Sequence, residues 1–123
     1  MNMKKILVTG ATGKVGSRFV SRILAKGYDV RILVRDAAKA PALVERGAEV
    51  VIGDLDNSDA LSAAVKGIDA VIHMAAYFRT VNDTEGIIRT NHAGTVALAN
   101  ASIAAGVKRF IFTSTSNVYG SDY

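Results

Sequence analysis

Three glycines at a spacing of three residues are the feature that most constrains the fold: Gly10, Gly13 and Gly16, within residues 9–16. The apolar run at residues 5–8 precedes them and predicts a buried strand. Apolar residues at helical spacing follow them, up to the stop signal Gly27. A strand, a glycine-rich turn and a helix N-terminus together favour binding of a dinucleotide pyrophosphate. The alternative is an ordinary strand-to-helix turn.

Apolar strands and helical segments alternate along the rest of the chain. We expect strands at residues 5–8, 30–34, 49–52, 70–74 and 109–113, and later helices at 41–46, 58–65 and about 91–105. Asn57 or Ser58 can cap the third helix, and a polar loop with a helical turn precedes the last one. Five such strands predict a parallel sheet covered on both faces. The sequence therefore predicts one α/β domain over 1–123, a Rossmann-type doubly wound sheet in the order 3-2-1-4-5. We expect it to be C-terminally incomplete, with the substrate-binding part absent.

Composition narrows the function classes. The chain has 15 basic and 11 acidic residues, but the basic ones are scattered, so we expect no nucleic-acid binding. It has no cysteine, which excludes disulfides and thiolate metal sites, and we expect no metal. No stretch is long and apolar enough to span a bilayer, so we expect no membrane partner and a cytoplasmic location.

The end of the second expected strand bears on the choice of cofactor. A NAD-binding fold places a carboxylate there, about 20 residues after the glycines, whereas this chain has Val34 followed by Arg35. An arginine can pair with a 2′-phosphate, so NADP is favoured. NAD remains the alternative, because Asp36 would reach the ribose after a shift of one residue. Arg35 could also be a solvated charge at the strand end.

Five motifs in order resemble the extended short-chain dehydrogenase/reductase family, the NAD(P)-dependent epimerases and dehydratases. They are the glycine turn, Gly53-Asp54-Leu55, His73-Met74-Ala75-Ala76, Asn91-x-x-Gly94-Thr95 and T-S-T-S-N-V-Y-G at 113–120. The stretch at 30–36 looks most like reductases similar to dihydroflavonol reductase, and the last motif more like nucleotide-sugar epimerases. The resemblance covers nearly the whole chain and implies that it is the N-terminal part of a family member.

The resemblance also implies which residues bind the cofactor. These are Gly10, Thr12, Gly13, Lys14, Val15, Gly16, Arg35, Asp54, Leu55, Met74, Ala75, Ala76, Asn91, Thr113 and Ser114. Asp54 would accept a hydrogen bond from the adenine amino group, or alternatively support the turn at Leu55. Asn91 would hold the active-site loop, or alternatively cap a helix. We expect His73 to be structural, because it stands among apolar residues at a strand end.

The last motif bears on catalysis. In the family a Ser or Thr beyond the fifth strand binds the substrate oxygen, and this role falls on Thr115. The Tyr-x-x-x-Lys pair that moves the proton in the family does not occur among these residues. Two functions follow as hypotheses. One is the NAD(P)-binding portion of a reductase or epimerase that transfers hydride at an alcohol, ketone or sugar carbon of a small-molecule substrate. The other is a non-catalytic NADP-binding or sensing module that binds a protein partner.

The fifth expected strand also bears on association. Its large side chains are Phe110, Ile111 and Phe112. We expect at least one of them to lack cover, because the elements that would follow in the family are absent. Uncovered strand edges promote pairing with another chain, so the sequence predicts a homo-oligomer through the unfinished sheet.

Overall fold

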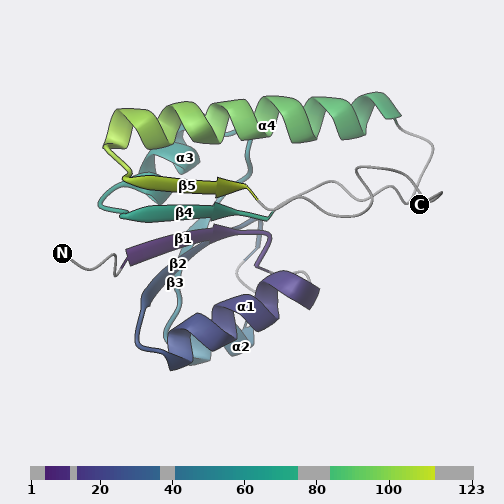
Figure 1. Ribbon diagram of the computed structural model, residues 1–123. Helices are drawn as coiled ribbons and strands as arrows, with labels where there is room; N and C mark the ends of the chain where they lie inside the picture. Colours follow the sequence, from purple (N-terminus) through teal and green to yellow (C-terminus); the bar gives the residue numbers. More distant parts are fainter. Residues whose placement is uncertain (1–4, 12–13, 37–40, 75–83, 113–123) are drawn as a thin grey trace, which may run out of the picture.

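Five parallel strands form a single sheet in the order β3-β2-β1-β4-β5 (Figure 1). The computed structural model describes residues 5–11, 14–36, 41–74 and 84–112. The strands are β1 (Lys5–Thr9), β2 (Asp29–Val34), β3 (Glu49–Ile52), β4 (Ala70–His73) and β5 (Arg109–Phe112). The order reverses beside β1, which pairs with both β2 and β4. The predicted doubly wound topology is confirmed.

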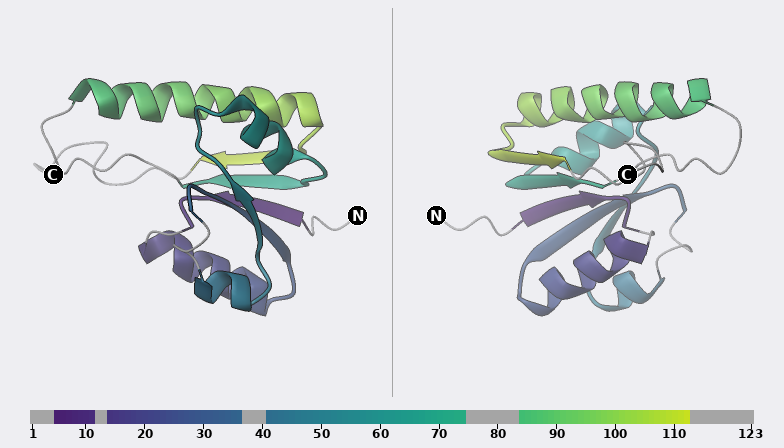
Figure 2. Two further views of the ribbon diagram at one scale, coloured as in Figure 1. Left: turned by 180° about the vertical axis from the view of Figure 1, so that it is seen from behind. Right: turned by 45° about the vertical axis from the view of Figure 1, so that its right-hand side comes forward.

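Helices cover both faces of this sheet (Figures 1 and 2). α1 (Lys14–Ala25) and α2 (Pro41–Glu45) lie on one face, and α3 (Ser58–Val65) and α4 (Thr84–Ala105) lie on the other. Alternate residues of β1 point into the two layers. Ile6 and Val8 pack with Val20 of α1, whereas Leu7 packs with Leu98 of α4. The central strand is therefore buried on both faces, as is typical of a parallel sheet.

The start of α4 differs from the sequence-based expectation. A loop with a helical turn was expected before about residue 91, but α4 begins at Thr84. The polar residues of the stretch before residue 91 favour a loop on sequence grounds alone, whereas the backbone is helical from Thr84. Thr84 followed by Glu85 was the available signal, because an acidic residue in the first turn interacts favourably with the helix dipole.

A buried arginine joins β2, β3 and the end of α3. Arg31 is 6% exposed, and its Nε forms an ion pair with Glu49 Oε1 at 2.9 Å. Its Nη1 donates to the carbonyl oxygens of Ala63 (3.3 Å), Ala64 (2.9 Å) and Lys66 (2.7 Å). These carbonyls lie at the C-terminus of α3, where helical backbone lacks internal partners and a positive charge is favourable. Sequence analysis did not single out Arg31.

We expect Arg31→Met to lower the free energy of unfolding by about 3 kcal/mol, because it leaves buried carbonyls without donors. The matched variant Glu49→Gln should cost less than about 1 kcal/mol, since the Glu49 side chain is 55% exposed. Urea unfolding followed by circular dichroism measures both. Equal losses in the two variants would show that the ion pair, and not the helix cap, is the main contribution.

β5 forms one edge of the sheet, and part of it lacks cover. Ile111 is 44% and Phe112 is 52% exposed, while Phe110 packs on the layer formed by α3 and α4. This confirms the expectation that at least one large side chain of this strand is uncovered. Association through this edge stays a prediction.

Candidate functional site

The residues predicted to bind the cofactor meet at the carboxyl end of the sheet. Gly10 follows β1, Arg35 follows β2, Asp54 lies just beyond β3, and Met74 follows β4. A hydrogen bond joins the ends of β2 and β3, because Gly53 N–H donates to Val34 O at 2.8 Å. Ligands of doubly wound sheets bind outside the carboxyl ends of the strands, where the strand order reverses. The predicted residues therefore gather at the place where such a fold binds its ligand.

The turn between β1 and α1 is crowded in a way that requires glycine. Gly10 has a φ of +74°, a conformation that L-residues with a side chain rarely adopt. A Cβ built on Gly16 would overlap the Gly10 carbonyl oxygen and lie 2.8 Å from its carbon. The first turn of α1 therefore packs directly on the backbone of the preceding turn. This cradle fits a pyrophosphate, which binds backbone N–H groups at a helix N-terminus.

Asp54 and Arg35 lie side by side at the ends of β3 and β2. Arg35 Nε is 3.0 Å from Asp54 Oδ2, and their side chains are 77% and 41% exposed. Asp54 Oδ1 also accepts a hydrogen bond from Leu55 N–H at 2.7 Å. The carboxylate is thus held at both oxygens. The alternative role of Asp54, support of the turn at Leu55, is present in this geometry.

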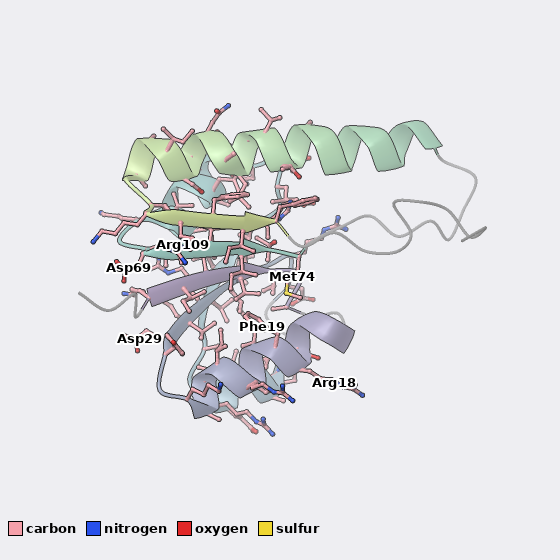
Figure 3. All side chains as sticks on the ribbon, in the orientation of Figure 1. Arg18, Phe19, Asp29, Asp69, Met74 and Arg109 are labelled. Atoms are coloured by element: carbon pink, nitrogen blue, oxygen red, sulfur yellow. The ribbon has the colours of Figure 1, made fainter. Side chains whose placement is uncertain are left out.

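Leu55 and Met74 are placed mainly by packing. Leu55 is buried in the layer with α3 and α4, where a Cβ on Gly94 would lie 2.9 Å from its Cδ1. Gly94 therefore allows α4 to approach the loop after β3. Met74 packs with Phe19 on the opposite layer, between the sheet and α1 (Figure 3). The side chain of Leu55 thus serves the core, while Met74 is half-buried at the strand end beside the glycine turn.

A buried histidine connects β1, β4 and α4 behind this site. His73 is fully buried, and its Nδ1 lies 2.7 Å from Thr9 Oγ1 and its Nε2 3.0 Å from Thr95 Oγ1. Thr9 Oγ1 also accepts a hydrogen bond from Met74 N–H at 3.0 Å. Burial lowers the pKa of His73 from 6.5 to about 4, so the ring is neutral at pH 7. This geometry agrees with the expectation that His73 is structural.

Sequence analysis missed the two threonine partners of this histidine. The signal that could have found Thr9 is the strand register, which places it opposite His73. The signal for Thr95 is weaker, because it depends on where α4 crosses the sheet.

Several predicted residues lie outside the described part of the chain. These are Thr12, Gly13, Ala75, Ala76, Thr113, Ser114 and Thr115. Lys14, Val15 and Asn91 lie within α1 and α4, but only their helical backbone is described. The structure thus brings together Gly10, Gly16, Arg35, Asp54 and Met74.

Among the residues that the structure describes, no group of three or more His, Cys, Asp or Glu side chains could hold a metal ion. Likewise, none of the helices in the described ranges is long and apolar enough to cross a membrane.

Comparison with known proteins gives consistent relatives. Residues 6–123 match the NAD dependent epimerase/dehydratase family. The photosystem II assembly factor Ycf39 of Trieres chinensis is 39% identical, over 92% of this chain and 35% of its own. A 3 beta-hydroxysteroid dehydrogenase/Delta 5-->4-isomerase of Mycobacterium tuberculosis is 36% identical, over 93% of this chain and 32% of its own.

A solved structure shows the same fold. It is a short-chain dehydrogenase/reductase superfamily protein from Agrobacterium tumefaciens with bound NAD. It is 36% identical, with a TM-score of 0.80 over 94% of this chain and 34% of its own. This chain spans about a third of the length of the curated relatives it matches.

Proposed function

The chain belongs to the NAD-dependent epimerase/dehydratase family, and we propose that it is the dinucleotide-binding portion of a reductase or epimerase that prefers NADP. The whole protein would transfer hydride at an alcohol, ketone or sugar carbon of a small molecule. One observation carries the binding part of this proposal. The Gly16 position has no room for a side chain beside the left-handed Gly10. Such a close approach of helix to turn serves a bound pyrophosphate.

The residues that the structure brings together at the carboxyl end of the sheet have distinct binding roles in this proposal. The turn at Gly10 and the start of α1 would hold the pyrophosphate, and Asp54 would face the adenine. Arg35 would meet the 2′-phosphate, because a guanidinium matches phosphate geometry, and its side chain is 77% exposed at the end of β2. The half-buried Met74 would place the end of β4 against the rings of the cofactor. The nicotinamide ring itself supplies the hydride chemistry when the dinucleotide is bound.

A second candidate function is a non-catalytic NADP-binding module with a protein partner. One observation favours it. A relative at 39% identity, the photosystem II assembly factor Ycf39 of Trieres chinensis, is an assembly factor by name. A Tyr-x-x-x-Lys pair in the natural protein beyond Tyr123, with Thr115 beside it, would favour the enzyme.

The proposed preference for NADP is tested at Arg35. We expect the chain to bind NADP about tenfold more tightly than NAD, since a hydrogen bond to a charged group contributes about 1.5–3 kcal/mol. Arg35→Ala should remove this preference by weakening NADP binding while leaving NAD binding unchanged. Isothermal titration calorimetry with both dinucleotides gives the two dissociation constants.

Arg22→Ala is the matched control for this experiment. Arg22 is an exposed arginine on α1, so its loss changes the net charge equally without touching the end of β2. It should leave the ratio of the two affinities unchanged. Equal affinities for NADP and NAD in the wild-type chain, unaltered in Arg35→Ala, would contradict the assignment of Arg35.

A further inference from the structure

The carboxylate of Asp54 is fixed in place beside Arg35. Its Oδ1 accepts from Leu55 N–H at 2.7 Å, and the backbone carbonyl of Asp54 accepts from Asn57 N–H at 3.0 Å. Asn57 in turn caps α3 by accepting from Ala60 N–H at 3.0 Å. The Asp54 side chain is therefore anchored by its own turn and by the helix that follows. Its second oxygen, Oδ2, lies 3.0 Å from Arg35 Nε.

The local charge balance at the ends of β2 and β3 is negative. Arg35 is the one cation within residues 34–36 and 53–56, whereas Asp36, Asp54 and Asp56 are anions. A phosphate group that approaches Arg35 therefore also approaches the Asp54 carboxylate. Like charges at such separations repel each other measurably even in water. A ribose hydroxyl at the same place carries no charge and meets no such repulsion.

We propose that Asp54 is a specificity-determining residue that limits the preference for NADP, because its carboxylate competes with the 2′-phosphate for Arg35. This inference rests on the proposed dinucleotide site. NADP binding must replace the ion pair between Arg35 and Asp54, whereas NAD binding leaves it in place. Because the side chains of Arg35 and Asp54 are 77% and 41% exposed, water screens the pair and it is weak enough to be replaced. Asp54 thus lowers the selectivity for NADP without abolishing NADP binding.

The substitution Asp54→Asn separates charge from hydrogen bonding. An asparagine Oδ1 can still accept from Leu55 N–H and from an adenine amino group. The variant should raise the ratio of NADP affinity to NAD affinity about fivefold relative to the wild type. In the Arg35→Ala background the gain from Asp54→Asn should be smaller, because the competition for the guanidinium has been removed and only the repulsion between carboxylate and phosphate remains.

Asp56→Asn is the matched control, because it removes the same charge from the same turn. Among the ion pairs of the described residues, none includes Asp56. It should change the ratio of NADP to NAD affinity by less than about twofold. Calorimetry on all variants, with circular dichroism to verify folding, gives the comparison. A repeat with 2′,5′-ADP and 5′-AMP, which differ only in the 2′-phosphate, removes the nicotinamide half from the measurement.

Two results would overturn the inference. One is a lowered ratio of NADP affinity to NAD affinity in Asp54→Asn. The other is an unchanged ratio; if both affinities fall by the same factor, Asp54 has a structural role only. Failure of the proposed function is distinguishable from both, because then neither dinucleotide binds the wild-type chain.

Discussion

Acidification from pH 7 to pH 4 should lower the free energy of unfolding by about 3 kcal/mol through His73 alone. Burial holds the pKa of this fully buried ring at about 4, below its ordinary value of 6.5. As the pH falls through 6.5, His73 binds a proton in the unfolded chain but stays neutral in the folded chain. The contribution of the neutral ring is therefore complete above pH 6.5 and is lost as the pH falls towards 4.

Urea unfolding at intervals between pH 7 and pH 4 measures this loss, with His73→Asn as the comparison. Asparagine can still accept a hydrogen bond from Thr9 but does not titrate, so the variant should lack the slope between pH 6.5 and pH 5. Carboxylates contribute equally to both proteins and cancel in the difference. Parallel stability curves would contradict the prediction. As an independent readout, one of the two histidines should keep the NMR shifts of a neutral ring at pH 5.

The elements that local sequence determines were predictable. β3 occupies Glu49–Ile52, as expected, because a β-branched apolar run is bounded there by turn residues. α3 ends at Val65 and begins after Asn57, whose side chain caps the helix by accepting from Ala60 N–H. Strand order followed from the alternation of strands and helices, since a parallel sheet permits few connections.

Partners set by tertiary packing were not predictable in the same way. Arg31 is 18 residues from Glu49 and 35 from Lys66, and only the packing of α3 on the sheet joins them. Register supplies part of this information, because it places Arg31 opposite Glu49 and Thr9 opposite His73. Arg35 and Asp54 were each selected for a role in binding, but their ion pair depends on where the loop after β3 turns. Polar pairs between residues far apart in the sequence could therefore not be predicted from the sequence alone.

Gly16→Ala should weaken the binding of both NAD and NADP by about 100-fold, equivalent to about 2.7 kcal/mol. The added Cβ would overlap the Gly10 carbonyl oxygen and lie 3.1 Å from Ala11 Cα. These are backbone atoms, so relief requires the turn or the start of α1 to move. Either movement takes the N–H groups of α1 away from the position of the pyrophosphate. Calorimetry with both dinucleotides measures the loss.

The free energy of unfolding of Gly16→Ala tests the same clash independently of ligand binding. Within an unobstructed helix, Gly→Ala stabilises by about 0.5–1 kcal/mol, because alanine has the higher helix propensity. Here the clash with the Gly10 backbone should reverse that sign. Ala25→Gly, at the exposed end of the same helix, makes the converse exchange and should leave dinucleotide affinity unchanged. A Gly16→Ala chain that is more stable than the wild type and binds both dinucleotides normally would show that Gly16 does not shape the site. A loss of affinity together with stability, absent in Ala25→Gly, would instead locate the binding determinant in the close approach of α1 to the turn after β1.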